Sequence, residues 1–309
     1  MNDRGGDPAA PKEAQRSPGR GGDHQTAFLE FGSTSIKFYL VATAGEEAGR
    51  VLEEIKIPWD LGFDVFQHAR ISPSTVARCT SALHELQARF PQIAFGSVTA
   101  VGTAALREAQ NAAVFQSVIG EELGLKIHVI DGGIEAFLLE TGFRDAVETF
   151  PTGLFDLGGG SLELVEYLSP VATKKTSLPL GAIRLHCMLR RTKDLFAYIE
   201  EGRRISGSIL REHLGGRTPD YTELIGTGGT VRTIVQLTGK EHVDVSDMQA
   251  LLDRELRGDV WSEVPSHRRR VLLPGFLVVE SLLTTLKLER IVYRSASVNQ
   301  GLISLTNLV

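Results

Sequence analysis

The sequence is poor in cysteine, and its only two, Cys79 and Cys187, offer neither a disulfide framework nor the spacing of a zinc site. No apolar run reaches the roughly eighteen residues that a bilayer-spanning helix needs, and the N-terminus has no apolar signal-peptide segment. We therefore expect a cytoplasmic protein with reduced thiols and no membrane contact.

Positive charge is not in excess either: 33 Lys and Arg residues face 38 Asp and Glu residues, which gives a net charge of -5. This balance argues against a nucleic-acid binder held by bulk electrostatics, and no DNA binding is expected. A polyanionic ligand would need a local basic site. The 309 residues, 42% of them hydrophobic, suffice for two modest domains.

Residues 1–25 contain Gly, Pro, Asp and Arg and almost no large apolar side chain. Such a segment cannot bury enough apolar surface to offset the entropy lost on ordering, so we predict a disordered, solubilising tail. The alternative is that its basic side chains contact an anionic partner.

The most informative stretch is residues 155–165, which read as apolar strand, acid, three glycines, hydroxyl, acid and apolar strand. Successive glycines let backbone N–H groups converge on an anion. If the strands fold back, Asp156 and Glu163 face one side of the turn. Two carboxylates beside a phosphate-binding loop favour a divalent metal shared with substrate oxygens. The alternative is a structural hairpin with solvated acids.

A second copy of this pattern lies at residues 27–41, where Glu30 corresponds to Asp156. The approximate repeat predicts two similar halves that face each other across a cleft, each donating one phosphate loop. A third glycine-rich turn, within residues 223–233, joins a strand to the start of a helix. That arrangement places backbone N–H groups and a helix N-terminus on an anion.

Two more side chains are candidates because each begins a predicted helix. Arg107 follows a strand predicted over 93–102, and its planar guanidinium suits phosphate; the alternative is a surface arginine paired with Glu108 or Glu121. Glu135 lies in the first turn of its helix. It is either a general base for an attacking water or an ordinary N-terminal helix acid.

Apolar spacing predicts helices over residues 72–90, 194–214 and 274–286. The first is amphipathic and should cover the outside of the first half. The last is apolar enough to be buried, either between the halves or at a dimer interface. A homodimer is the expected assembly.

Six motifs, in this order along the chain, resemble those of the exopolyphosphatase/guanosine pentaphosphate phosphatase (Ppx/GppA) family. They are Glu30-Phe-Gly-Ser-Thr-Ser, Thr103-Ala-Ala-Leu-Arg-Glu-Ala, Gly133-Ile-Glu-Ala, Asp156-Leu-Gly-Gly-Gly-Ser-Leu-Glu, Ser177-Leu-Pro-Leu-Gly-Ala-Ile-Arg-Leu and Gly226-Thr-Gly-Gly-Thr-Val-Arg-Thr. The resemblance implies an α/β fold: two ribonuclease-H-like domains of the actin/Hsp70/sugar-kinase superfamily around a central cleft. We expect these domains at residues 26–150 and 151–309, as in the short, two-domain type of the family.

The resemblance also implies removal of the terminal phosphate of inorganic polyphosphate, of pppGpp, or of both, with Mg²⁺ (or Mn²⁺) as cofactor. It makes Glu135 the general base and Arg107 a phosphate-contacting arginine. Asp156, Glu163 and Glu30 would hold metal, and Glu163 would also orient water. The implied phosphate cradle consists of Gly32, Ser33, Thr34, Ser35, Lys37, Gly158, Gly159, Gly160, Ser161, Gly226, Thr227, Gly228 and Gly229.

Several positions depart from the family pattern. Glu30 replaces Asp, Thr34 replaces Asn, Lys37 stands where Arg is common, Ile134 and Arg270 stand where acids are usual, and Asn299 replaces an arginine. Lysine in place of arginine exchanges a bidentate fork for a point charge. These departures keep a second hypothesis open, a catalytically weak or inactive protein that binds polyphosphate or a nucleotide. The retained acids and Arg107 favour the enzyme.

Overall fold

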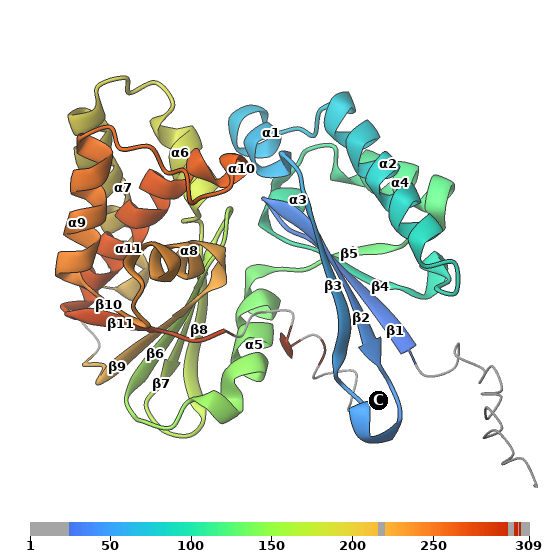
Figure 1. Cartoon of the computed structure of the whole chain (residues 1–309), viewed down its shortest axis with the longest axis horizontal. Helices are drawn as coiled ribbons and strands as arrows, with labels where there is room; N and C mark the ends of the chain where they lie inside the picture. Colours follow the sequence, from blue (N-terminus) through green and yellow to red (C-terminus); the bar gives the residue numbers. More distant parts are fainter. Residues whose placement is uncertain (1–24, 216–219, 296–299, 302, 304–309) are drawn as a thin grey trace, which may run out of the picture.

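The computed structural model describes residues 25–215, 220–295, 300, 301 and 303. The predicted disordered tail lies outside these residues except for Gln25, which begins the first strand. No helix in the described part of the chain is long and apolar enough to cross a membrane. Figure 1 shows two α/β halves side by side, each built on one sheet.

The sheet of the first half has the strand order β3-β2-β1-β4-β5. Its first three strands pair antiparallel, whereas β4 pairs parallel with β1 and β5 parallel with β4, as in a ribonuclease-H-like domain. The strands are β1 (Gln25–Phe31), β2 (Ser35–Ala42), β3 (Val51–Pro58), β4 (Thr99–Gly102) and β5 (Ile127–Val129). The helices are α1 (Leu61–His68), α2 (Pro73–Arg89), α3 (Ala104–Glu108) and α4 (Ala112–Leu123).

Strand β1 carries apolar residues on both faces, interrupted by Glu30, because both faces are covered. Leu29 and Phe31 face the core beneath the helices. Phe28 lies on the other face, where it packs with Tyr39 and with Ile303 from the end of the described chain. Ile303 thus packs on the sheet of the first half.

The second half repeats the first. Its sheet has the order β10-β11-β9-β6-β7-β8, in which β8-β7-β6-β9-β11 reproduces the order and directions of the first sheet and β10 is added at the edge. The strands are β6 (Thr152–Leu157), β7 (Leu162–Tyr167), β8 (Ala172–Leu178), β9 (Glu223–Thr227), β10 (His242–Asp244) and β11 (Arg290–Tyr293). The predicted internal repeat and fold class are confirmed.

The helices of the second half bury its larger core. They are α6 (Ala182–Leu189), α7 (Leu195–Leu214), α8 (Gly228–Thr238), α9 (Val245–Leu256), α10 (Ser266–Arg269) and α11 (Leu272–Leu286). The long helix predicted to begin at residue 194 is confirmed, with Asp194 as its N-cap. The apolar helix α11 is buried as predicted, but it packs against α7 and α9 within this half. Its burial therefore requires no dimer interface, and the homodimer stays a prediction.

Helix α5 (Gly132–Phe143) connects the two halves. It precedes residue 150, where we placed the domain boundary, yet Leu139 and Phe143 pack with Leu154 and Val165 of the second sheet. The predicted strand over residues 93–102 is shorter in the structure. Its first part is a 3₁₀ turn, Phe95–Ser97, because that turn buries the Phe95 side chain.

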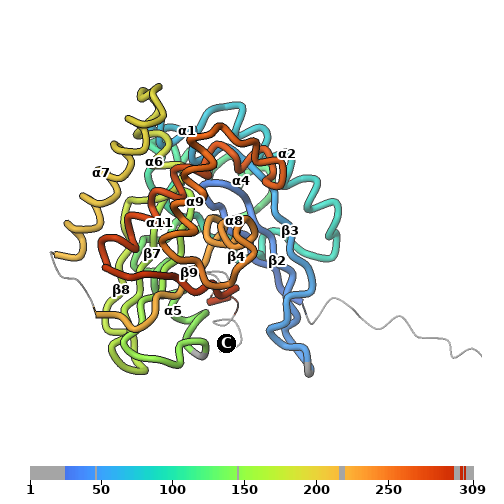
Figure 2. The backbone as a smooth tube through the Cα atoms, turned by 60° about the vertical axis from the view of Figure 1, so that its left-hand side comes forward, coloured from blue at the N-terminus to red at the C-terminus, as the bar shows by residue number. Residues whose placement is uncertain are grey.

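The halves meet through α1 and α6, which lie against each other at one end of the molecule (Figure 1). Figure 1 shows α10 near this contact, and Figure 2 shows α11 beside α6 within the second half. Arg270 crosses it and donates to Asp60 over 3.0 Å, with its guanidinium 4.1 Å from the centre of the Phe63 ring. Two strand hairpins, one from each half, thereby face one cleft.

Candidate active site

The two hairpins present matching positions to the cleft. In the second half, Asp156 on β6 pairs in register with Glu163 on β7, so both carboxylates lie on one face. In the first half, Glu30 pairs in the same way with Lys37. The repeat thus places three acids and one ammonium group around the cleft, with Lys37 in the position that Glu163 occupies in the other half.

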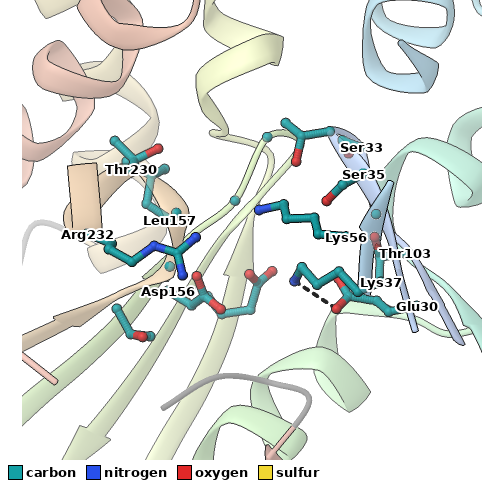
Figure 3. Close-up of a pocket in the computed structure, with 18 of the residues that line it drawn as sticks. Glu30, Ser33, Ser35, Lys37, Lys56, Thr103, Asp156, Leu157, Thr230 and Arg232 are labelled. Carbon is teal, nitrogen blue, oxygen red and sulfur yellow. Dashed lines mark hydrogen bonds and ion pairs between the residues drawn. The ribbon is translucent and has the colours of Figure 1, made fainter. Parts of the chain in front are cut away.

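Lys37 is held by acids rather than left free for a ligand. Its Nζ lies 2.9 Å from Glu30 Oε2, as the dashed line in Figure 3 shows. Burial alone would lower the pKa of Lys37, but Glu30 and Asp156 raise it above its ordinary value. The lysine therefore stays charged and neutralises part of the acidic cluster.

Glu135 enters the site from the first turn of α5, which Asp131 caps by accepting from the Ile134 amide at 2.8 Å. Arg107 Nη1 donates to Glu135 Oε1 over 2.5 Å and to the Ile130 carbonyl over 2.7 Å. Arg107 does not line the cleft cavity itself. In this structure it orients Glu135, and its predicted contact with phosphate stays a prediction.

Burial raises the pKa of three acids of the site, Glu135, Asp156 and Glu163. It raises the pKa of Glu135 to about 7 against the opposing effect of Arg107, and that of Asp156 to about 6 against Lys37. The pKa of Glu163 lies well above its ordinary value because burial is reinforced by Glu135 and Asp156. Acids with raised pKa values are typical of functional sites, and a pKa of about 7 lets Glu135 exchange a proton at neutral pH.

The triple-glycine loop turns its carbonyls away from the cleft. Those of Gly158 and Gly159 accept from the amides that open α6, at 2.9 to 3.1 Å, and that of Gly160 accepts from Arg184 Nε at 2.6 Å. A side chain on Gly181 would overlap the backbone of this loop. Among the described residues, the Gly159 and Gly160 amides have no backbone acceptor, so they remain available to an anion.

The loop of the first half repeats this arrangement. The Gly32 and Ser33 carbonyls accept from Trp59 Nε1 at 2.7 Å and from the Gly62 amide of α1 at 2.9 Å. Ser35 Oγ is buried at the cleft wall and has no hydrogen-bond partner in the described part of the chain. A buried hydroxyl without a partner in the protein can donate a hydrogen bond to a bound ligand.

Arg184 connects the triple-glycine loop to the first half. Its guanidinium forms a two-pronged ion pair with Glu108 of the first half, one bond of which is 2.8 Å long, and lies 4.2 Å from the centre of the Phe66 ring. Glu108 immediately follows Arg107. Glu108 was one alternative partner of Arg107 in the sequence analysis, whereas the structure pairs it with Arg184 and pairs Arg107 with Glu135.

The cleft holds a cavity of about 330 Å³ lined by both halves. The predicted site residues that line it are Glu30, Gly32, Ser33, Thr34, Ser35, Lys37, Glu135, Asp156, Gly158, Gly159, Gly160, Ser161, Glu163, Thr227, Gly228 and Gly229. Gly226 does not line it, because it lies within β9, where its missing side chain makes room for the Phe155 ring. Gly228, at φ +91°, makes the turn into α8 beside the Asp156 carboxylate.

Three basic residues that sequence reasoning missed also line the cavity: Lys56, Arg232 and Arg268. Figure 3 shows Lys56 extending into it and Arg232 lying beside Asp156. Burial and the neighbouring Arg268 lower the pKa of Lys56 to about 8, and burial with Arg232 lowers that of Arg268 to about 10. Such shifts mean that the positive charge here is not balanced by resident acids, as expected of an anion site.

The residues that depart from the family pattern lie at different places relative to the cavity. Arg270 does not disturb the cavity, since it pairs with Asp60 at its edge. Its neighbour Arg268 enters the cavity and donates to Thr233. Ile134 is 44% exposed on α5. Asn299 lies outside the described residues.

Within the described residues, no three His, Cys, Asp or Glu side chains form a preassembled metal site. Asp156 and Glu163 still suit a hard cation, because both present carboxylate oxygens to the cavity. The Asp156 carboxylate forms no hydrogen bond within the described chain, and the Glu163 carboxylate accepts one from Ser177 at 2.8 Å. Glu30 is occupied by Lys37, which leaves the other two acids as the better pair.

Residues 40–306 match the sequence profile of the Ppx/GppA phosphatase family. The chain belongs to this family. The Ppx/GppA relatives include the guanosine-5'-triphosphate,3'-diphosphate pyrophosphatase of Pseudoalteromonas translucida, 23% identical over 296 residues that make up 90% of this chain and 58% of that protein. The bifunctional 3-dehydroquinate synthase/phosphatase of Fusobacterium nucleatum is 23% identical over 267 residues, 78% of this chain and 39% of that protein. This chain thus spans only part of the length of these curated relatives.

Solved structures share the Ppx/GppA fold. An exopolyphosphatase from Cytophaga hutchinsonii superposes with a TM-score of 0.77 at 20% identity, covering 92% of this chain and 98% of the other. A Ppx-GppA enzyme from Aquifex aeolicus superposes with a TM-score of 0.71 at 19% identity, covering 91% and 99%. At these identities the likeness establishes the fold, which is the predicted pair of ribonuclease-H-like domains.

Proposed function

We propose that this Ppx/GppA phosphatase hydrolyses the terminal phosphoanhydride bond of a polyphosphorylated substrate with the help of a divalent cation. One observation supports the proposal most: a single cavity gathers acids, cationic side chains and two phosphate-type loops. Glu135, Asp156 and Glu163 line it together with Lys56, Arg232 and Arg268. The acids can activate water and hold a cation, and the cationic side chains can bind an anion.

Glu135 acts as the general base. Arg107 occupies Oε1, and Oε2 accepts no hydrogen bond from the described residues. A pKa of about 7 makes the carboxylate a base that is about half ionised at neutral pH and strong enough to take a proton from water. Glu135 thus accepts the proton that water loses as it attacks the terminal phosphorus.

The loop amides and the cationic side chains bind the transferring and leaving phosphates. Gly159 and Gly160 donate from one half and Ser35 from the other, while Lys56 and Arg268 neutralise the charge on the leaving group. Asp156 and Glu163 would hold Mg²⁺ or Mn²⁺, which would supply charge neutralisation at the phosphoryl oxygens. Lys37 stays paired with Glu30, and its charge opposes the rise in the pKa of Asp156.

Phosphate release from tripolyphosphate with Mg²⁺ tests this proposal, with the Glu135→Gln variant measured beside the natural protein. We expect release that the variant reduces by at least about a hundredfold. Equal background from both proteins would refute hydrolysis. The binding-protein alternative would gain support if tripolyphosphate still raised the Tm of both.

A further inference from the structure

Two lysines line the cleft cavity, and their surroundings differ. Lys37 and Lys56 are register partners on the neighbouring strands β2 and β3, so both side chains point to the same face of the sheet. The Lys37 ammonium group is bound to Glu30. The Lys56 ammonium group forms no ion pair or hydrogen bond with the residues that the structure describes. Lys56 is therefore the lysine of this cavity that is open to a ligand.

Neighbouring cations make the Lys56 amine more nucleophilic. Burial, Arg268 of α10, Lys37 and Arg232 of α8 lower the pKa of Lys56 to about 8, and Glu30 opposes them. At neutral pH a larger share of Lys56 than of an ordinary lysine is therefore the neutral amine, which is the form that attacks a carbonyl. A partly buried lysine beside other cations is a known setting for a lysine nucleophile.

Donors suited to a phosphate group lie in the same cavity as this amine. Ser35 is the register partner of Pro58, two positions from Lys56, so the Ser35 hydroxyl lies on the same face of the sheet as the Lys56 side chain. That hydroxyl has no hydrogen-bond partner in the described part of the chain. Gly159 and Gly160 line the cavity from the other half. A phosphate group held by these donors brings whatever is attached to it close to the Lys56 amine.

Lys56 also lines a second cavity, of about 320 Å³, which shares Thr34, Arg268 and Val271 with the cleft cavity. The lining of this second cavity includes four further apolar or aromatic side chains, those of Pro58, Trp59, Phe63 and Ile183. Lys56 therefore lies where the two cavities meet. A small acyl group has room beside its amine, outside the phosphate-type loops.

We propose that Lys56 is a covalent modification site for acyl phosphates, which bind in the cleft through their phosphate group and transfer the acyl group to the lysine. The neutral amine attacks the carbonyl carbon and an amide N–C bond forms. The C–O bond of the mixed anhydride breaks, and the proton that the amine loses leaves with the orthophosphate. Acylation removes the positive charge of Lys56 and should therefore weaken anion binding in the cleft. Only the effect on phosphate release rests on the proposed function, because acyl transfer requires binding alone.

The test exposes the full chain to acetyl phosphate with Mg²⁺ near neutral pH and follows acetylation of each lysine by peptide mass spectrometry. We expect Lys56 to react at least about tenfold faster than Lys37 and the exposed Lys193, and tripolyphosphate to suppress the reaction at Lys56. Acetic anhydride is the matched reagent, because it carries the same acyl group without the phosphate. Ser35→Ala should slow acetylation of Lys56 by acetyl phosphate about tenfold and leave acetylation by acetic anhydride unchanged.

Equal rates at Lys56 and Lys193, or a rate at Lys56 that tripolyphosphate does not change, would overturn the inference. An equal preference for Lys56 with both reagents would also overturn it, because the phosphate group would then not direct the transfer. The acetylated protein and the Lys56→Gln variant should each show a KM for tripolyphosphate raised by about tenfold. An unchanged KM in both would refute the effect on phosphate release. Failure of the proposed function is distinguishable, since the unmodified chain would then release no phosphate from tripolyphosphate.

Discussion

Replacing Arg184 with lysine should slow phosphate release while changing substrate binding little. The substitution keeps the charge but removes the 2.6 Å bond from Nε to the Gly160 carbonyl and one of the two bonds to Glu108. A bond from a charged donor contributes about 1.5 kcal/mol, and the half-exposed pair with Glu108 adds about 0.5 kcal/mol. Together these amount to about 2 kcal/mol.

If these 2 kcal/mol hold the triple-glycine loop in position in the transition state, the substitution lowers kcat by about thirtyfold and changes KM by less than about threefold. Arg203→Lys is the matched control, because Arg203 also forms a two-pronged pair, with Glu280 at 2.7 and 2.9 Å, but away from the cleft. It should lower Tm without lowering kcat. Steady-state kinetics that gave the same kcat for both lysine variants would refute the positioning argument and leave Arg184 a purely structural residue.

Four further outcomes are expected. The kcat/KM of the natural protein should rise with pH through about 7 as Glu135 ionises, and this dependence should vanish in Glu135→Gln, as stopped phosphate assays from pH 5 to 9 would show. KM should rise above about pH 8, where Lys56 loses its proton, and Lys56→Arg should abolish that rise. In metal-free protein the raised pKa values of Glu135 and Asp156 favour folding at low pH, so the free energy of unfolding should fall by on the order of 2 kcal/mol between about pH 4 and pH 7. Mg²⁺ should reverse this loss at pH 8. A free energy of unfolding from urea denaturation that did not change with pH would contradict this prediction. Gly160→Ala would bring a Cβ within 2.6 Å of Ser33 Oγ and 2.8 Å of Ala104 Cβ, both across the cleft, and should cut kcat at least about tenfold with a smaller change in Tm.

The sequence predicted the hairpins and their acids because these features are local. Three glycines after an acid fix a tight turn whatever surrounds it, and a seven-residue spacing across that turn places Asp156 opposite Glu163. Glu135 was predictable for a similar reason, since Asp131 and the glycines after it mark a helix start. The repeat of this hairpin predicted two similar halves, and the family resemblance implied the ribonuclease-H-like fold of each.

The basic side of the site was not predictable from sequence. Lys56 lies on an ordinary edge strand and Arg268 in a short run of arginines, and only the packing of the two halves brings them to one cavity. The motif placed Gly226 in the phosphate cradle, but the register of β9 places it against the Phe155 ring. Local pattern specifies a turn, but which side chains meet across a cleft depends on tertiary structure.

The measurement that tests the central claim most directly is hydrolysis of tripolyphosphate in ¹⁸O-labelled water with Mg²⁺, followed by mass analysis of both products. The account predicts one labelled oxygen in the released orthophosphate and none in the pyrophosphate, with both products absent for Glu135→Gln. Label in the pyrophosphate would place the attack at the inner phosphorus. That result, or unchanged release by the variant, would contradict attack on the terminal phosphate by a water that Glu135 activates.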